Sequence, residues 1–493
     1  SELRTPHSEL PIPHSELKDE QVSESLKTEE KLVSRFYILT LDGELIDIDK
    51  FDYTGHENLK YFVEYETKKV RAYGEEPGHI RLMRELEIAD FEAGSDPGNL
   101  RWYPKGRFMK KLIERYVSDI CIKYGAMEVE TPIMYDFEHP SLKKYLNRFP
   151  SRQYIVRSDI KQYFLRFAAC FGQFLIAHDA VISYKNLPFR IYELTKYSFR
   201  REKSGELAGL KRLRTFTMPD MHTLCADLNQ AKEEFFLQFE LCINWMNSLG
   251  LEFEPSFRVQ NDFYNENKDW YKKIVQRIGK PILIEIFDVR YAYFITKFEF
   301  NVIDSQRKAG ALSTVQIDVE NSETYDLTFT DATGKKQRPI LLHASISGST
   351  DRVIYALLEK EYINIKNGKK GEFPLWLTPV QVRLIPVGKE FVDDCILLQK
   401  KFDDQYIRCD IDDTDEKVPY KIRIAEKEWI PIIIVYGKKE RDSGMLTVRF
   451  RNGELKSLKF EALIEYITEK IKDYPREKLS LTPLMTKRII FRG

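Results

Sequence analysis

Three side chains that bind metals well, one thiol and two imidazoles, stand out in the sequence. Histidine is scarce, with eight in the chain, so His222 in RTFTMPDMHTLC and His343 in PILLHASISGSTDR are candidates for chemistry. Cys170 lies in RFAACFGQF. Taken alone, each is more typical of a buried core residue than of a ligand. The three are also too far apart for a zinc-finger spacing, so spacing by itself does not predict a metal site.

Arginines form a second candidate site, which would bind an anion. The segment YSFRREKSGELAGLKRLRTFTMPDMH is basic and aromatic, with a Ser-Gly turn between two strand-like halves. This predicts a hairpin that presents Arg200 and Arg212 to phosphate or carboxylate oxygens, with Phe216 placed to stack on a planar base. Arg352 follows the small-residue run ASISGST. The alternatives are a charged surface hairpin and an ordinary exposed helix charge, and the pattern leaves them open.

The composition predicts a protein with two or three hydrophobic cores to position these residues. The chain has 493 residues, 43% of them hydrophobic, and its 77 basic residues are balanced by 77 acidic ones. This balance excludes a globally basic chain but not a local basic groove. Because no stretch approaches a membrane span and the first residues carry no export signal, we expect a cytoplasmic protein without a membrane partner. Six scattered cysteines argue against a disulfide scaffold.

The first 78 residues divide into two segments. Residues 1–33 carry a seven-residue repeat whose prolines oppose helix formation, which predicts a flexible low-complexity tail. Residues 34–78 open with alternating apolar residues around Asp42 and Gly43. This alternation predicts a hairpin within a small β-rich element.

The remaining chain divides at a Gly/Lys/Pro passage near residue 373. Residues 79–373 contain an amphipathic helix between Phe108 and Cys121, followed by strand-like runs such as 291–304. Residues 374–493 alternate strand and helix, and IPIIIV is apolar enough to be buried on both faces of a sheet. This second part is predicted to be an α/β domain.

Three motifs occur in order within residues 79–493: a helix leading to EVETPIM, then SFRRE with RTFTMPDMH, and then ISGSTDR. Together they resemble a class II aminoacyl-tRNA synthetase of the archaeal threonyl kind. The first resembles the dimer-interface motif of that family, the second its ATP-binding hairpin, and the third its strand–helix motif that ends in arginine. FPLWLTPVQV, PYKIRIAE and IPIIIVYGKKE resemble the anticodon-binding domain shared by several such enzymes. The resemblance implies an α+β, multidomain homodimer with a class II antiparallel sheet flanked by helices and a C-terminal α/β anticodon-binding domain.

The resemblance also implies a reaction and the residues that perform it. Threonine and ATP would form threonyl-adenylate, and threonine would then pass to the 3′ end of tRNA(Thr). Arg200 would neutralise the charge that develops as the carboxylate attacks the α-phosphate, and Arg212 and Arg352 would hold the outer phosphates with Mg²⁺. Arg200 and Arg352 are thus the catalytic candidates. Glu202 would meet the adenine side of ATP, on which Phe216 would stack.

Further positions match the family residue by residue. The zinc ligands of the family, one cysteine and two histidines, match Cys170, His222 and His343. The residues that line the threonine and adenylate pocket match Asp220, Lys297 and Gln316. The residues that read anticodon bases match Glu440 and Arg449. For this last pair the alternative is a charged turn between strands.

Zinc explains how such a pocket would select threonine. An apolar pocket separates threonine from the nearly isosteric valine by only about 1–3 kcal/mol. A zinc ion held by three protein ligands keeps positions open for the amino and hydroxyl groups of threonine, and valine has no hydroxyl. Serine has both groups, so we expect weak rejection of serine.

Two features qualify the resemblance. The family usually removes serine errors with an N-terminal editing domain, and 78 residues are too few for one, so we expect a separate trans-editing protein. Phe171-Gly172-Gln173 stands where bacterial relatives have Pro-Gly-His, which leaves open the group that assists the tRNA 3′ ribose. The alternative function is a non-catalytic paralogue that binds tRNA, although such copies would be expected to lose the motif arginines or metal ligands.

Overall fold

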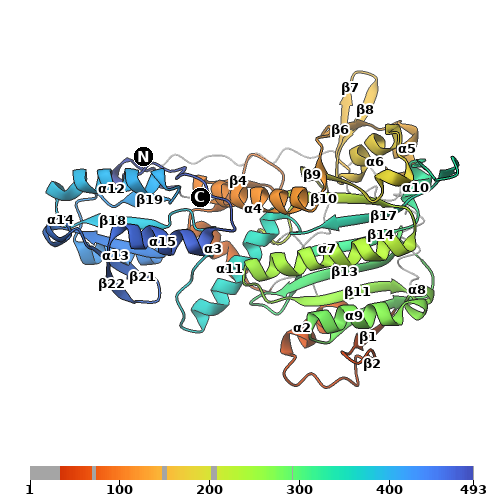
Figure 1. The fold of residues 1–493 in the computed structure, drawn as a ribbon, viewed down its shortest axis with the longest axis horizontal. Coiled ribbons are helices and arrows are strands. Elements are labelled where there is room, and N and C mark those ends of the chain that lie inside the picture. Colours follow the sequence, from red (N-terminus) through yellow and green to blue (C-terminus); the bar gives the residue numbers. More distant parts are fainter. Residues whose placement is uncertain (1–33, 69–73, 147–152, 201–207, 291, 492–493) are drawn as a thin grey trace, which may run out of the picture.

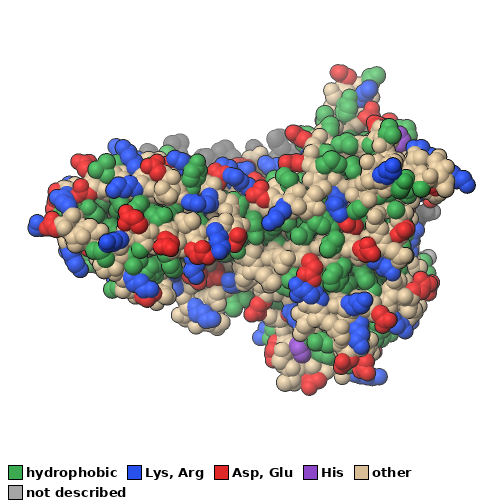
Figure 2. Space-filling model, viewed as in Figure 1, with side chains coloured by type: hydrophobic (Ala, Val, Ile, Leu, Met, Phe, Trp, Pro, Cys, Tyr) green, Lys and Arg blue, Asp and Glu red, His purple; other side chains and the backbone are tan. Residues whose placement is uncertain are grey.

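The computed structural model describes residues 34–491 apart from 69–73, 147–152, 201–207 and 291. Figure 1 shows a larger unit built around one broad sheet and a smaller C-terminal unit beside it. None of the helices in the described ranges has the length and apolar character needed to cross a bilayer. Basic and acidic side chains are interspersed over the face shown in Figure 2, as the balanced composition predicts.

Ten strands of the described chain form the main sheet, in the order β2-β1-β12-β11-β13-β14-β17-β10-β9-β5. All neighbours are antiparallel except the pairs β11–β12 and β5–β9. The predicted hairpin is confirmed, because β1 pairs with β2 and Gly43 has a φ of 86°. The strands are β1 (Ser34–Leu39), β2 (Leu45–Asp47), β5 (Met127–Glu128), β9 (Phe189–Ser198), β10 (Thr215–Cys225), β11 (Glu254–Gln260), β12 (Ile282–Phe287), β13 (Phe294–Ile303), β14 (Ala309–Asp318) and β17 (Ile340–Ser345).

Alternation along the strands separates the two faces of this sheet. Leu39 and Ile282 lie in the main core, whereas their neighbours Ile38 and Leu283 lie in a second core with Leu59. Helices α4 (Pro104–Lys123), α7 (Leu228–Ser248) and α11 (Thr350–Lys366) pack on the main-core face, and α2 (Glu57–Lys68) packs on the other. The predicted helix between residues 108 and 121 is α4.

Smaller elements surround the main sheet. Strands β6 (Met134–Asp136), β8 (Lys161–Leu165) and β7 (Ile155–Ser158) form a small sheet at the top of Figure 1. Two further strand pairs are β3 (Ala89–Phe91) with β4 (Leu100–Trp102) and β15 (Phe329–Thr330) with β16 (Lys336–Gln337). The remaining helices of this unit are α3 (Gly78–Glu85), α5 (Pro140–Leu146), α6 (Cys170–Asp179), α8 (Asn261–Glu266), α9 (Lys268–Ile278) and α10 (Asn321–Thr324).

The C-terminal unit has the predicted α/β architecture. Its sheet has the order β19-β18-β20-β21-β22, and β18 is parallel to both β19 and β20. Ile432 and Ile434 enter one core and Ile433 enters another, so β20 is buried on both faces, as expected from its sequence. The elements are β18 (Val382–Pro386), α12 (Val392–Asp404), β19 (Cys409–Ile411), α13 (Val418–Lys427), β20 (Ile432–Tyr436), α14 (Lys438–Ser443), β21 (Leu446–Phe450), β22 (Leu455–Leu458) and α15 (Phe460–Ile471).

The predicted domain limits remain predictions, but two observations bear on them. Strand β1 pairs along its length with β12, so residues 34–39 extend the main sheet. Between α11, which ends at Lys366, and β18, which begins at Val382, the chain has no helix or strand, and the predicted boundary at residue 373 lies there. The tail 1–33 lies outside the described residues.

Candidate active site and metal centre

Cys170, His222 and His343 converge on one buried point. Strands β10 and β17 place His222 and His343 directly opposite each other, and Cys170 begins helix α6 above them. The Cys170 Sγ lies 3.2 Å from His222 Nε2 and 3.5 Å from His343 Nδ1, and the two nitrogens are 3.0 Å apart. Residues that are far apart in the sequence therefore form one cluster of possible ligands.

Hydrogen bonds behind the cluster orient both imidazoles. The His222 Nδ1 lies 2.7 Å from Gln173 Oε1, and the His343 Nε2 lies 2.6 Å from Asp318 Oδ2. Because these oxygens only accept, both nitrogens must be the donors. When a ring is neutral, its other nitrogen therefore directs a lone pair into the cluster, as metal-binding histidines do.

The donor set fits a zinc ion. Two lone pairs that face each other at 3.0 Å repel unless a cation or a proton lies between them. Burial, with a smaller contribution from His343, holds the pKa of His222 well below its usual value, which favours the neutral ligand form. Two nitrogens and a sulfur bound tetrahedrally to zinc lie about 3.3–3.6 Å apart, so the cluster needs only small shifts to hold one.

Sheet register aligns four of the predicted site residues in one row. Lys297 on β13 pairs with Gln316 on β14, Gln316 pairs with His343, and His343 pairs with His222. Residues directly opposite in an antiparallel sheet point to the same face. The pairing therefore places four residues from four strands side by side, which no local sequence pattern reveals.

A cavity of about 220 Å³ opens beside the cluster. Asp220 and Gln316 line it together with the three cluster residues. Burial, and secondarily the negative charge of Glu193, raises the pKa of Asp220 to about 7. The other residues that line the cavity are Phe167, Ala168, Tyr197, Met218, Tyr293, Thr314, Ala344 and Ser345.

Tyr293 is a site residue that the sequence reasoning missed. Its hydroxyl donates to Gln316 Oε1 at 2.9 Å, and its ring centroid lies 4.9 Å from that of His343. The run YAYFITKF indicated a strand without distinguishing which of its aromatic residues faces a ligand. Tyr293 directly precedes β13, and its carbonyl oxygen accepts from the Val319 backbone N–H just after β14, so the pairing of these two strands places it beside the cluster.

The predicted anion-binding hairpin is formed by β9 and β10. These strands are paired from Phe189 to Ser198, and Arg200 follows β9 as an exposed residue. Phe216 on β10 packs edge-on against Phe199, with ring centroids 5.1 Å apart. Glu202 lies outside the described residues.

Arg352 lies in the first turn of α11, next to the chain that carries Arg212. Ser349 caps this helix by accepting from the Arg352 backbone N–H at 3.2 Å. The Arg352 guanidinium donates to the carbonyl oxygens of Lys211 at 2.9 Å and Ala311 at 2.8 Å. The Arg352 guanidinium therefore lies against the residue that directly precedes Arg212.

Comparison with known proteins identifies the family. Residues 154–361 match the family model "tRNA synthetase class II core domain (G, H, P, S and T)", and residues 381–470 match "Anticodon binding domain". A threonine–tRNA ligase of Pyrococcus furiosus is 56% identical over 97% of this chain and 77% of its own length. The chain belongs to the threonine–tRNA ligase family. It is therefore an enzyme, an aminoacyl-tRNA ligase, and the resemblance in its motifs is confirmed.

Other relatives agree with this assignment. The threonine–tRNA ligase of Methanosarcina acetivorans is 49% identical over 96% of this chain and 75% of its own length. A solved structure described as the RNA-binding domain of threonyl-tRNA synthetase from Cryptosporidium parvum has a TM-score of 0.71 at 20% identity and covers 82% of this chain and 99% of its own. At that identity the likeness shows the fold alone, which confirms the predicted architecture.

Lys297 takes part in a network of charged side chains on the main sheet. Its ammonium lies 2.8 Å from Glu299 Oε1. Burial alone would raise the pKa of Glu299, but the positive charges of Lys297, Arg258 and Arg352 outweigh it and hold that pKa below its usual value. Lys297 is therefore placed beside the pocket with its charge partly compensated.

Both carboxylate oxygens of Glu440 accept hydrogen bonds from other residues of the C-terminal unit. Its Oε2 accepts from the Gly437 backbone N–H at 3.0 Å, and its Oε1 accepts from the Thr447 hydroxyl at 2.6 Å. Arg449 is half-buried on β21, opposite Ile433. These contacts give Glu440 a clear role at the start of α14, and its reading of an anticodon base stays a prediction.

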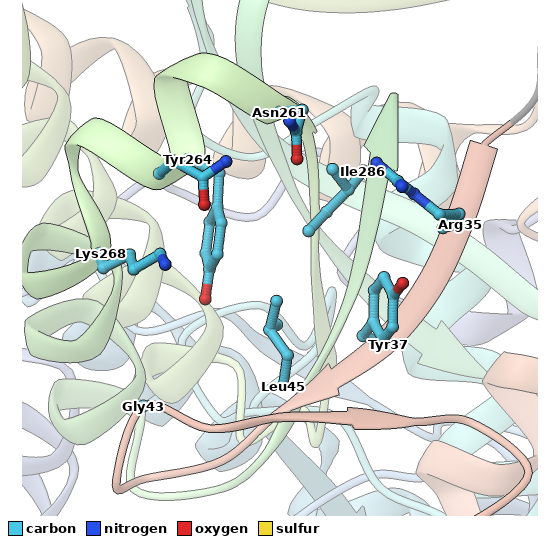
Figure 3. Close-up of a pocket in the computed structure, with 9 residues that line it drawn as sticks. Arg35, Tyr37, Gly43, Leu45, Asn261, Tyr264, Lys268 and Ile286 are labelled. Atoms are coloured by element: carbon cyan, nitrogen blue, oxygen red, sulfur yellow. The ribbon is translucent and has the colours of Figure 1, made fainter. Parts of the chain in front are cut away.

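A second cavity, of about 310 Å³, lies at the opposite edge of the main sheet (Figure 3). Arg35 and Tyr37 from β1 face Tyr264 and Lys268 from the helices after β11 across it. Arg35 is exposed and forms an ion pair with Asp288 at 2.6 Å. None of the predicted site residues lines this cavity.

Proposed function

We propose that this ligase activates threonine with ATP and Mg²⁺ and transfers it to the 3′ end of tRNA(Thr). The observation that carries the proposal is the buried Cys170, His222 and His343 cluster at the base of a 220 Å³ cavity. Arg200, Arg212 and Arg352 would supply the positive charge that an ATP-dependent reaction needs. The names of the relatives support the same substrate.

The metal proposed for the cluster is zinc. Zinc bound by these three side chains would supply a Lewis-acidic centre with open positions that favours an amino acid carrying a hydroxyl beside its amino group. Gln173 and Asp318 hold the two imidazoles in the ligating tautomers. Asp220 and Gln316 line the cavity where the substrate amino group and the adenylate would lie.

We assign the ATP site to the face of β9 and β10. Arg200 holds the α-phosphate and the substrate carboxylate, so that charge is neutralised as the carboxylate attacks phosphorus. Phe216 stacks on the adenine, and Glu202 meets the adenine edge. Arg212 and Arg352 hold the outer phosphates with Mg²⁺, and pyrophosphate leaves from that side.

Serine is the substrate that this pocket rejects least. It has the same amino and hydroxyl groups as threonine and lacks one methyl group, which is worth about 1–3 kcal/mol. We propose that the 493-residue chain forms some seryl-tRNA and relies on a separate trans-editing protein to hydrolyse it. Seryl-tRNA that persists with the chain alone supports this proposal, and hydrolysis by the chain contradicts it.

Two further partners are proposed, the tRNA anticodon for the C-terminal unit and a second copy of the chain for the larger unit. Glu440 and Arg449 are proposed to read anticodon bases as an acceptor and a fork-shaped donor. A homodimer is proposed through the end of α4 and the segment that follows it, where Ile122, Met127 and Ile133 are 48%, 54% and 63% exposed. A contiguous exposed apolar patch marks an interaction site, and these three side chains are the candidates for such a patch.

The decisive experiment is pyrophosphate exchange with threonine, serine and valine, before and after metal chelation. We expect rapid exchange with threonine, slower exchange with serine and very little with valine. Chelation should abolish the exchange, and mass spectrometry should find one zinc per chain. Exchange with none of the three would favour the non-catalytic, tRNA-binding alternative. Unchanged rejection of valine in zinc-free protein would refute the zinc proposal alone.

A further inference from the structure

The chain segment that carries Arg212, residues 208–214, is seated against two other elements. We call it the arginine segment. Gly209 in this segment has a φ of 49°, and a Cβ there would lie 2.4 Å from the Nε2 of His79 on α3. His79 is fully buried, and its Nδ1 lies 2.7 Å from Glu359 on α11. The segment therefore packs closely against His79, a buried side chain that is held in place by its bond to Glu359.

Lys211 anchors the arginine segment through its side chain. The ammonium is buried and donates to Asp304 Oδ2 at 3.0 Å, and the Tyr355 hydroxyl donates to the same oxygen at 3.2 Å. The ring centroids of Tyr65 and Tyr355 lie 5.4 and 5.7 Å from the Lys211 Nζ. A buried lysine placed between an acidic and two aromatic groups has a well-defined position.

The carboxylate that receives Lys211 is itself fixed. Its Oδ1 accepts from the backbone N–H groups of Gln306 at 3.0 Å and Lys308 at 2.9 Å, in the turn between β13 and β14. Burial lowers the pKa of Lys211 to about 8, Asp304 opposes this effect, and Arg352 adds to it. Lys211 and Asp304 thus form a charged pair, and replacing either residue with a neutral one would remove the interaction between their charges.

The backbone of Lys211 holds the other phosphate-binding arginine. Its carbonyl oxygen accepts from Arg352 Nε, and the Ala311 carbonyl oxygen accepts from Arg352 Nη1. Lys211 is thus bonded through its side chain to the β13–β14 turn and through its carbonyl to Arg352, and it directly precedes Arg212. Lys211 is therefore bonded directly to Arg352 and joined to Arg212 through the backbone.

We propose that Lys211 is a positioning residue for ATP, and that its bond to Asp304 makes Arg212 and Arg352 converge on the same phosphates. The inference rests on the proposed ATP site. It predicts that the ammonium–carboxylate bond affects the binding of ATP and leaves the binding of threonine unchanged, because threonine lies at the metal cluster.

The test compares Lys211→Met, Asp304→Asn and the double variant by threonine-dependent pyrophosphate exchange. Each single variant should raise the KM for ATP about 10-fold, the value expected for a hydrogen bond to a charged group. The double variant should be no worse than either, because both changes remove the same interaction. The KM for threonine and the zinc content should stay at the wild-type values.

A matched control is Glu234→Gln, which breaks another largely buried ion pair of the same sheet. Arg190 on β9 donates to Glu234 on α7 at 2.6 Å, away from the arginine segment. This variant should lose stability without a change in the KM for ATP. If Lys211→Met does not fold, Tyr355→Phe removes one hydroxyl and should raise the KM for ATP about 3-fold.

The outcomes separate the inference from the proposed function. A wild-type chain with no threonine-dependent exchange would refute the proposed function first. Normal wild-type exchange with an unchanged KM for ATP in Asp304→Asn and Tyr355→Phe would overturn the role of Lys211 alone. Equal increases in the KM values for ATP and threonine would also overturn it, because they would indicate a general structural defect.

Discussion

At the residue scale, the cluster depends on side chains that are not themselves among its three possible ligands. Gln173 bonds His222 through its oxygen and donates to the Asp220 carbonyl oxygen at 3.2 Å, so its amide cannot rotate freely. Asp318 is held by the backbone N–H groups of Glu320 and Asn321. These bonds fix the tautomers of both histidines before any metal arrives.

We predict that Gln173→Ala weakens zinc binding. Without the acceptor, His222 can protonate its Nε2 and direct a proton at the cluster in place of a lone pair. The zinc dissociation constant should rise about 10- to 100-fold, measured by competition with a chromophoric chelator. Gln238→Ala is the control, because Gln238 is also fully buried but bonds Thr223 outside the cluster. An equal loss of affinity in both variants would contradict the prediction.

At the element scale, α11 serves two sites along its length. Its first turn carries Arg352, and its third turn carries Glu359, which bonds the backbone and side chain of His79 on α3 and the backbone N–H of Ser305. Burial alone would raise the pKa of Glu359, but the interactions with His79 and Ser305 outweigh it and lower this pKa to about 2. These bonds hold α11 against α3 and against the turn between β13 and β14.

We predict that Glu359→Gln destabilises the fold in a pH-dependent way. Because the folded pKa of Glu359 is about 2 and its ordinary value is 4.5, the ionised form favours the folded state above pH 4.5. This contribution, up to about 3 kcal/mol, is lost as the pH falls from 4.5 towards 2. Urea unfolding should show a variant less stable than the wild type at pH 7, with the difference closing below pH 4.5.

The control for this prediction lies on α3. Glu85 pairs with Arg81 at 2.7 Å, and both side chains are more than half exposed. Glu85→Gln should change the free energy of unfolding by less than about 0.5 kcal/mol. A pH-independent loss in Glu359→Gln would indicate a packing defect and argue against the charge interaction.

At the scale of the whole molecule, one hydrophobic core continues from the catalytic unit into the C-terminal unit. Trp376 stacks on Tyr474 with ring centroids 4.9 Å apart, and both rings contact Tyr116 of α4. Lys105 at the start of α4 bonds Glu428 at 3.4 Å. The two units are therefore held in a defined orientation, which suits an enzyme that must engage both ends of one tRNA.

We predict that Ile133→Asp converts a homodimer into monomers. Ile133 lies in the predicted dimer-interface motif EVETPIM and is 63% exposed in the single chain, so a carboxylate there would be buried without a partner on association. Light scattering should give the mass of two chains for the wild type and one for the variant. Val289→Asp, at a residue 68% exposed in the loop between β12 and β13, should stay dimeric. A monomeric wild type would contradict the proposal.

The sequence by itself determined the family, the order of the motifs and most elements. The helix of residues 108–121, the strand near 291–304 and the doubly buried strand in IPIIIV are present as expected, because apolar periodicity follows directly from which face is buried. It also supplied the ligand types and, through family resemblance, their positions. Local spacing alone left Cys170, His222 and His343 as three ordinary core residues.

Only the tertiary structure decided which residues meet. Sheet register places His343 between His222 on one neighbouring strand and Gln316 on the other, and no pattern within one strand specifies its neighbours. The roles of Gln173 and Asp318, the position of Tyr293 and the linkage of Lys211 to Asp304 and Arg352 likewise depend on long-range contacts. Hydrophobic periodicity records burial along one element, whereas the chemistry of this site depends on the packing of several elements against each other.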